Sequence, residues 1–280
     1  MVVAALAAAL GACSAIKLAY ATFDEFAFWW LDGYVDFNDD QEPRVREDLK
    51  RLHLWHRSEE LPRIAALLRG VEELVPGNVT PEQACAFWPQ LRDRVQAVIH
   101  RAEPAAVAHA MEMGETQFAN LQRKYDRNNA NFRRDWVNEP REKIQRKRAE
   151  QFADRTENVY GKLSRAQHRL IEEHVAQSQF DPRRTLAERQ RRQQDAMQTL
   201  RRIAGQKLAA PEARALLHAY IERAQVSPDP AQRQYQETLI NENCRLVAQL
   251  HNSTTPAQRE HALKKLRGWQ RDLRDLAGQP

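Results

Sequence analysis

The stretch DDQEPRVREDLKRLHLWHRSEELPRIAALLRGVEELV, residues 39–75, decides the fold class of this chain. Its apolar residues recur three or four positions apart, the spacing that places side chains on one face of a helix. The stripe consists of Val45, Leu49, Leu52, either Trp55 or His56, and then Ile64, Leu67, Leu68 and Val71. Pro62 lies inside the run, and because proline has no backbone N–H to donate, we expect the helix to kink or restart near Glu60.

The rest of the chain has the same helical character. Arg, Gln, Ala, Glu and Leu dominate, 29% of the residues are charged, and only 9 of 280 are glycine. The strand-forming residues Val, Ile and Thr are thinly spread, and no alternating run bounded by turn residues predicts a sheet. The composition predicts an all-α protein. The length allows one large domain or two, and we expect residues 13–280 to form a single helical domain.

A four-residue pattern, a capping residue followed three positions later by glutamine, marks several helix starts. It occurs as NDDQ at 38–41, TPEQ at 80–83, SRAQ at 164–167 and TPAQ at 255–258. The intervals between the first residues are 42, 84 and 91. The second interval is twice the first, as an internal repeat would give, but the third is not a multiple of 42. The pattern therefore favours ordinary helix starts, although a repeat stays open.

The first twelve residues, MVVAALAAALGA, are apolar and lead into Cys13. One interpretation is the first turns of a buried helix, because Ala, Leu and Val are common in helical cores. The other is an export signal, which has a short apolar region ending in small residues. The segment is shorter than the roughly 20 apolar residues that span a bilayer. No Lys or Arg precedes the apolar run, which departs from the usual signal.

The block Leu10-Gly11-Ala12-Cys13 resembles the lipobox of bacterial lipoproteins, in which cleavage leaves an acylated cysteine at the new N-terminus. The resemblance implies that residues 1–12 are a signal peptide and that Cys13 carries the lipid anchor. Ser14 stands where an aspartate would resemble an inner-membrane retention signal, so the expected location is the periplasmic face of the outer membrane. Two or three acyl chains anchor a protein firmly.

Lipidation of Cys13 would leave Cys85 and Cys244 as an even pair in an oxidising compartment. We expect a disulfide between them, the alternative being two buried free thiols. The bond would close a loop of 159 residues, for which chain entropy gives about 5 kcal/mol.

Residues 139–208 differ from the rest of the chain. Two helical stretches there carry only thin apolar stripes, so we expect them to pair as an elongated, protruding helical hairpin. Between residues 141 and 202 there are 16 Lys and Arg against 9 Asp and Glu. The candidate anion-binding residues are Arg146, Lys147, Arg148, Arg183, Arg184, Arg191 and Arg192.

This basic arm predicts contacts with anionic lipid headgroups, lipopolysaccharide phosphates or acidic client proteins. We expect no nucleic-acid partner, because an exported protein does not meet one. The competing interpretation is a solvated helix face with i,i+4 pairs such as Glu142 with Arg146.

An aromatic cluster follows the proposed anchor and is made of Phe23, Phe26, Phe28, Trp29, Trp30, Tyr34 and Phe37. Aromatic residues this close to a lipidated cysteine suit the membrane interface. Acidic residues such as Asp24 and Asp32 interrupt the run, which argues against deep insertion, and we favour a core role for the cluster.

Catalytic signatures are missing from the sequence. His168 and His174 are six residues apart on one predicted helix, a rotation of about 600°, so they do not converge as metal ligands. No nucleophile elbow, Gly-rich phosphate loop or CxxC pair occurs. We therefore predict no catalytic residues, no metal and no cofactor.

The segments WWLDGYVDFNDDQ and LWHRSEELP, following a lipobox, resemble an uncharacterised family of helical bacterial lipoproteins. The residues that carry the resemblance are Trp29, Trp30, Asp32, Tyr34, Trp55, His56, Arg57, Glu60, Leu61 and Pro62. The resemblance implies an envelope location and supplies no activity. The segment LSRAQ at 163–167 is also similar to the Leu-Thr-x-x-Gln motifs of Spy-like periplasmic chaperones.

Together these observations predict a lipid-anchored, non-enzymatic envelope protein that binds, scaffolds or holds other molecules. The alternatives are an envelope enzyme acting on peptidoglycan or, if the signal is not real, a cytosolic basic helical binding protein.

Overall fold

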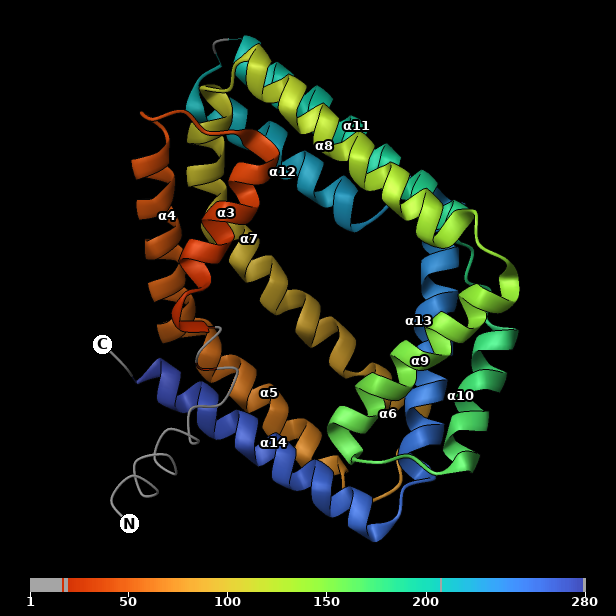
Figure 1. The fold of residues 1–280 in the computed structure, drawn as a ribbon. Helices are drawn as coiled ribbons and strands as arrows, with labels where there is room; N and C mark the ends of the chain where they lie inside the picture. The colour runs from red at the N-terminus through yellow and green to blue at the C-terminus, as the bar shows by residue number, and fades with distance from the viewer. Residues whose placement is uncertain (1–16, 18–19, 207, 279–280) are drawn as a thin grey trace, which may run out of the picture.

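The computed structural model describes Lys17, residues 20–206 and residues 208–278, and these described residues contain helices and turns but no strand. The all-α prediction is confirmed. The helices are α3 (Phe23–Val35), α4 (Glu42–Trp55), α5 (Leu61–Leu74), α6 (Pro81–Cys85), α7 (Phe87–Met111), α8 (Glu115–Phe132), α9 (Arg141–Tyr160), α10 (Arg165–Gln177), α11 (Pro182–Gly205), α12 (Ala210–Gln225), α13 (Pro230–Asn252) and α14 (Pro256–Ala277) (Figure 1). The predicted signal peptide, residues 1–12, and the predicted lipidation residue Cys13 lie outside the described residues.

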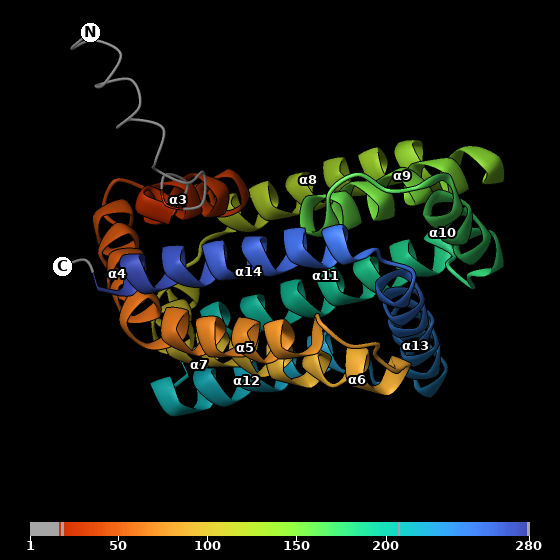
Figure 2. The same ribbon diagram turned by 90° about the horizontal axis from the view of Figure 1, so that it is seen from below.

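The helices form the sides of a closed frame, and the chain doubles back along it: α7 returns beside α5, and α11 returns beside α8 (Figure 1). The last helix, α14, returns to lie along α5, and α13 crosses beside α6 (Figure 2). Apolar contacts in the described part of the chain are divided among several small clusters. One cluster joins α9, α10 and α13, another joins α7, α11 and α12, and a third joins α5 and α14. Each side of the frame is therefore held by its own local core.

Helices α4 and α5 are joined by a π-helical turn, His56–Glu60, which forms the bend in the stretch 39–75. Pro62 occupies the first turn of α5, where its missing N–H costs no helical hydrogen bond. The wider turn absorbs the change of direction ahead of the proline. The predicted restart near Glu60 is confirmed.

The predicted capping residues form reciprocal hydrogen bonds at the helix starts. The hydroxyls of Thr80, Ser164 and Thr255 each accept the backbone N–H of the glutamine three residues later, at 3.2 Å. In return each glutamine side chain accepts the N–H of the capping residue, at 2.8 to 3.0 Å. Two N–H groups that the first helical turn cannot satisfy are thus paired at each start.

Capping glutamines from distant helices also meet one another. The Gln167 side chain donates to the Gln258 side chain at 3.0 Å, which joins the starts of α10 and α14. Likewise Gln117 donates to Gln41 at 2.7 Å, which joins the start of α8 to the turn before α4. These glutamines therefore both cap a helix and fix where two helix ends meet.

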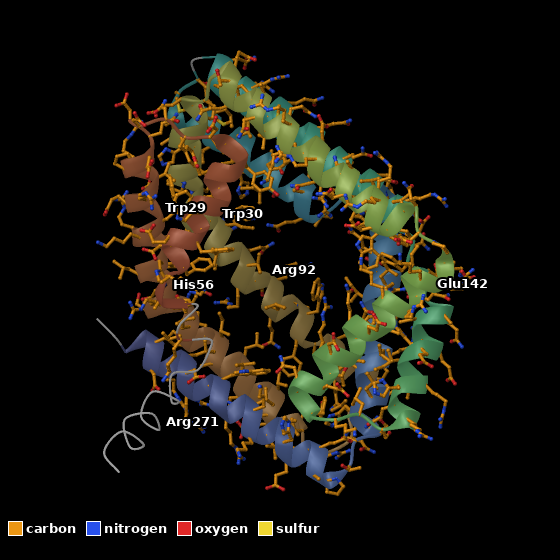
Figure 3. The ribbon with its side chains drawn as sticks, viewed as in Figure 1. Trp29, Trp30, His56, Arg92, Glu142 and Arg271 are labelled. Atoms are coloured by element: carbon orange, nitrogen blue, oxygen red, sulfur yellow. A yellow bond between two sulfur atoms is a disulfide. The ribbon has the colours of Figure 1, made fainter. Side chains whose placement is uncertain are left out.

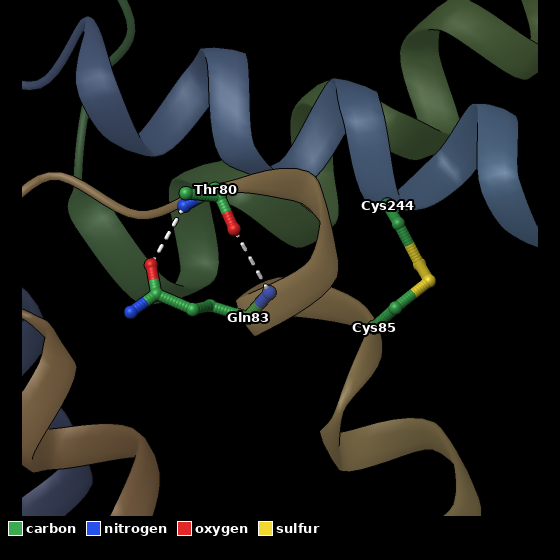
Figure 4. The surroundings of a disulfide bond; sticks show 4 residues. All are labelled: Thr80, Gln83, Cys85 and Cys244. Atoms are coloured by element: carbon green, nitrogen blue, oxygen red, sulfur yellow. Dashed lines mark hydrogen bonds between the residues drawn. A yellow bond between two sulfur atoms is a disulfide. The ribbon is translucent and has the colours of Figure 1, made fainter.

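The predicted disulfide between Cys85 and Cys244 is present and joins α6 to α13, with a Cα–Cα distance of 5.4 Å (Figure 4). Helix α6 has only five residues and buries none of them. Near the bond, Asn252 of α13 exchanges two hydrogen bonds with the backbone of Val79, each 2.9 Å. Because α6 has little apolar surface to bury, the covalent bond is its principal attachment.

The predicted protruding hairpin at 139–208 is a point where the structure differs. Helices α9 and α10 pair with each other and pack against α14 and α13, whereas α11 packs against α7, α8 and α12. Alanines account for the difference, because Ala153 of α9 and Ala196 of α11 are buried and widen the apolar stripes. The segment is therefore part of the frame and does not stand out as an arm (Figure 1).

Removing the disulfide should lower the free energy of unfolding by about 2–5 kcal/mol, because the unfolded chain regains the freedom of a 159-residue loop. The variant Cys85→Ser/Cys244→Ser should lose this amount relative to the oxidised wild type in equilibrium urea unfolding. Reducing agent should destabilise the wild type and leave the variant unchanged. Equal stability of the oxidised wild type and the variant would contradict the structural role.

Candidate functional site

A cavity of about 830 Å³ lies among α3, α4, α7 and α8. This volume is within the range of small-molecule sites, which are typically 300–1,000 Å³ and mostly apolar. Its apolar walls include Leu31, Val35, Phe37, Val45, Leu49, Leu52, Met113, Leu121 and Leu200. Three other hollows in the described part of the chain are smaller, at about 420, 550 and 670 Å³.

The sequence of α7 explains why this space stays open. The helix presents a run of short side chains, Ala102, Ala105, Ala106, Ala108 and Ala110, along the cavity wall. Alanine leaves room where leucine would reach the opposite helix. The facing wall is α3, whose C-terminal turn is closed by Asp36 in the left-handed region, φ 63°.

An imidazole and a carboxylate are hydrogen-bonded to each other in the cavity wall. His109 Nε2 of α7 lies 2.8 Å from Asp48 Oδ2 of α4, and Arg51 also bonds to the Asp48 carboxylate. The other ring nitrogen, His109 Nδ1, is buried and has no hydrogen-bond partner among the described residues. If Nε2 carries the hydrogen and donates to Asp48, Nδ1 is an acceptor available to a hydroxyl group entering the cavity.

Two arginines lie at the edge of the cavity, and one of them, Arg51, is ion-paired with Glu47 and Asp48. Arg51 and Arg101 line both the cavity and a neighbouring hollow of about 550 Å³ that reaches Trp55 and Ala277. Arg101 has no salt bridge within the described residues, and its guanidinium lies 5.8 Å from the centre of the Trp55 ring. The junction of the two hollows therefore offers a positive charge to an anionic group. On the wall, burial raises the pKa of Tyr125 to about 12, so its hydroxyl stays neutral.

Helix α3 exposes a row of aromatic side chains, and the expectation that the whole cluster forms core is wrong. Phe28 alone of the α3 phenylalanines and tryptophans is buried, and the Arg46 guanidinium lies 3.7 Å from the centre of its ring. The exposed members are Phe23, Phe26, Trp29 and Trp30, whose exposed fractions are 49%, 66%, 65% and 56%. A helix with aromatics on all sides can pack only one side against α4 and α8. We call these four residues the aromatic face; Figure 3 labels its two tryptophans.

Trp30 belongs to both features, because it is exposed on the aromatic face and also lines the cavity. Its ring packs against Tyr34, another lining residue, with 4.8 Å between ring centres. The apolar cavity is therefore continuous with the exposed aromatic face at Trp30.

The first half of the predicted family motif shapes this end of the molecule. Asp32 accepts the backbone N–H of Phe37 at 2.9 Å and stabilises the turn after α3. The Tyr34 hydroxyl accepts a hydrogen bond from the Asn128 side chain of α8 at 2.9 Å. These residues hold α3 at its distance from α8.

The second half of the motif holds the bend between α4 and α5. Arg57 donates to the carbonyl of Leu276 at 3.2 Å and so ties the bend to the last turn of α14. Glu60 is fully buried and is paired with Arg63 at 2.6 Å and Arg94 at 3.4 Å. Leu61 is buried beside it, and Pro62 starts α5.

His56 does not form the structural pair with Glu60 that i,i+4 spacing suggests. Its Nδ1 lies 2.7 Å from the Tyr20 hydroxyl, and burial lowers the pKa of its ring. The π-helical turn changes the angular relation between positions 56 and 60, so the i,i+4 geometry is lost.

The candidate anion-binding residues are distributed over α9 and α11 and are largely engaged within the protein. The Arg148 guanidinium lies 4.3 Å from the centre of the Phe180 ring, and burial lowers its pKa. Lys147 and Arg184 lie over the rings of Trp136 and Tyr235, both at 4.2 Å.

The last pair, Arg191 and Arg192, binds the carboxylate of Glu188 at 2.8 Å each. Arg146 and Arg183 complete the predicted set, on α9 and α11 respectively. The structure does not gather these cations into one site, because the two helices pack against different parts of the frame.

One cluster was missed by the sequence analysis. His100, Glu103 and His218 bring three potential metal-ligand atoms within 4.8 Å of one another. The spacing of His100 and Glu103 on one helix was a readable signal, but His218 comes from α12, 118 residues after His100. His168 and His174, which the sequence predicted would not converge on a metal, have separate surroundings. His168 Nε2 lies 3.8 Å from Glu157 Oε1, whereas His174 Nε2 is buried and has no hydrogen-bond partner among the described residues.

Comparison with known proteins gives a family. The chain matches DUF6279, described as a family of unknown function, over residues 33–222, more than half of its length. The chain belongs to this family. The predicted membership of an uncharacterised family is thereby confirmed. No curated protein and no solved structure matches the chain.

The region matched in DUF6279 covers the bend motif, the cavity wall on α4, α7 and α8, and the His100 cluster. It starts at Gly33, so the aromatic face lies outside it. Among the described residues, no helix is both long and apolar enough to span a bilayer.

Because the cavity is apolar and of the size of a small-molecule site, we expect an apolar ligand to enter it and a bulky substitution in its wall to block that entry. We expect Ala105→Trp to weaken binding of a fluorescent fatty acid at least tenfold, because the indole would occupy the space beside α7. Fluorescence titration measures the effect, with Ala166→Trp on the exposed side of α10 as the control. Identical binding by both variants and the wild type would show that the cavity is not the site.

Proposed function

We propose that this DUF6279 protein is a lipid-anchored, non-enzymatic binding protein of the cell envelope, located at the periplasmic face of the outer membrane. Its cavity takes the acyl part of an anionic amphipathic lipid, and Arg101 at the edge binds the acidic headgroup. The observation that carries the proposal is the continuity, at Trp30, between an apolar cavity with Arg101 at its edge and an exposed aromatic face.

The position of the aromatic face along the chain supports a membrane contact. Phe23 follows Cys13 by ten residues, and ten extended residues span at most about 35 Å. A lipid anchor at Cys13 would therefore keep α3 close to the bilayer surface. Tryptophan is enriched at the boundary between headgroups and water, where its ring and N–H are both accommodated.

The residues of the cavity favour binding over catalysis. Asp48 and His109 form a hydrogen-bonded pair, but the lining includes no Ser, Thr or Cys to act as a nucleophile. Asp48 is also the only carboxylate among the lining residues, whereas glycoside hydrolysis generally uses two. This chemistry supports a binder over the alternative of an enzyme acting on peptidoglycan.

A second candidate is a chaperone-like role, in which the aromatic face holds apolar segments of unfolded proteins. The four exposed aromatic side chains favour it, because contiguous apolar surface on a protein commonly marks an interaction site. Competition separates the two functions, since an unfolded peptide should displace a cavity-bound fatty acid only if both use the same surface.

The anchor is tested by expressing the full chain and a Cys13→Ala variant in a Gram-negative cell. The wild type should lose residues 1–12, gain the mass of two or three acyl chains, and sediment with outer membranes. The variant should keep an unmodified residue 13 and leave the membrane fraction. Retention of residues 1–12 in a soluble wild-type protein would contradict the envelope proposal.

Membrane contact by the aromatic face is tested with the lipidated protein in vesicles of anionic phospholipid that contains brominated acyl chains. Bromine quenches nearby tryptophans, so quenching should fall strongly in Trp29→Ser/Trp30→Ser. The control is Trp88→Ser, which removes a comparably exposed tryptophan at the start of α7. If quenching falls in the Trp88 variant, or does not fall in the double variant, a different surface contacts the bilayer.

A further inference from the structure

Three side chains outside the cavity converge between α7 and α12. His100 Nδ1 lies 3.5 Å and His218 Nδ1 3.6 Å from the same atom, Glu103 Oε2. The two imidazole rings stack with 5.4 Å between their centres. All three potential ligand atoms are within 4.8 Å of one another, and the proposed lipid site uses none of them.

Glu103 is the observation that calls for a ligand. The residue is 2% exposed, and neither carboxylate oxygen has a hydrogen-bond partner. A buried carboxylate without hydrogen bonds is costly, because the lost hydration is not replaced. Among the described residues, Arg214 is the one permanent cation within 4 Å of it, with Nε 3.4 Å from Oε1 but no hydrogen bond.

We propose that His100, Glu103 and His218 bind a Zn²⁺ ion. Zinc accepts imidazole nitrogen and carboxylate oxygen at about 2.0–2.2 Å, so tetrahedral ligands lie about 3.4 Å apart. The two observed nitrogen-to-oxygen distances, 3.5 and 3.6 Å, are close to this edge length. Imidazole ligands favour zinc over Mg²⁺ and Ca²⁺, which prefer oxygen.

Two charged residues next to the three ligands, Glu222 and Arg214, are also compatible with a bound zinc ion. His218 Nε2, on the far side of the ring, lies 3.8 Å from Glu222 Oε1, so a carboxylate is placed to orient the imidazole and raise its basicity. Arg214 approaches Glu103 Oε1, whereas both histidines approach Oε2. The carboxylate can therefore keep Arg214 on one oxygen and bind zinc through the other.

A bound ion would cross-link α7 to α12 beside their shared apolar cluster. Both imidazoles are substantially exposed, with side chains 50% and 41% accessible, so the fourth coordination position faces solvent. Water or a group from another molecule would complete the tetrahedron. Zinc should thus stabilise this side of the frame by binding the folded chain in preference to the unfolded one.

Isothermal titration of the metal-free full chain with ZnCl₂ tests the proposal. We expect one saturable ion per chain with a Kd in the micromolar range or tighter, and a higher Tm with zinc bound. His218→Ala and Glu103→Gln should each weaken binding at least tenfold. His168→Ala is the matched control, because His168 is also an exposed histidine near a carboxylate, and its removal should leave the affinity unchanged.

Two further measurements keep the test decisive if a ligand variant folds poorly. Glu222→Gln keeps all three ligands and should still weaken zinc binding severalfold, because the His218 imidazole loses its carboxylate partner. Titration with Co²⁺ should give the intense visible absorption of a tetrahedral site. No saturable zinc binding by the wild type, or equal weakening by His168→Ala and His218→Ala, would overturn the assignment.

Discussion

The covalent bond between Cys85 and Cys244 is the constraint on which the frame depends. It fastens the five-residue α6, which has no buried residue of its own, to the long helix α13. Helix α7 begins at Phe87, two residues beyond the bond, and so starts from a fixed point. Because α7 supplies both the alanine wall of the cavity and the His100 and Glu103 side chains, both sites depend on how its start is held.

The same bond bears on the compartment. Disulfides persist in oxidising environments and are rare in the cytosol of most organisms, which supports the proposed envelope location. The small clusters that hold each side of the frame also explain why a cross-link is useful. No single core spans the described helices, so the disulfide, the packing of α14 on α5 and paired capping glutamines such as Gln167 and Gln258 add to the cohesion that the local clusters give between distant segments.

Features set by local chemistry were predictable from the sequence. Pro62 acts through its own missing N–H, and the capping boxes act within four residues, so both could be assigned before the structure. The width of the apolar stripes on α9 and α11 was harder to assess. Ala153 and Ala196 are small yet buried, so these helices pack within the frame and do not form the expected arm.

Features set by the frame could not be predicted. The aromatic residues of α3 have the composition of a core, but their exposure depends on how many neighbours α3 has, and periodicity does not reveal that. Similarly, His218 meets Glu103 only because α12 packs on α7. The cavity has the same origin, since short side chains on α7 leave a space only where a second helix stands opposite them.

The central claim, that the cavity holds an anionic lipid, is tested most directly by native mass spectrometry of the full chain released gently from its own membranes. The account predicts one non-covalently bound anionic lipid per chain, in addition to the covalent acyl mass on Cys13. A chain that carries only the covalent mass, and takes up no lipid when mixed with an extract of the same membranes, would contradict it.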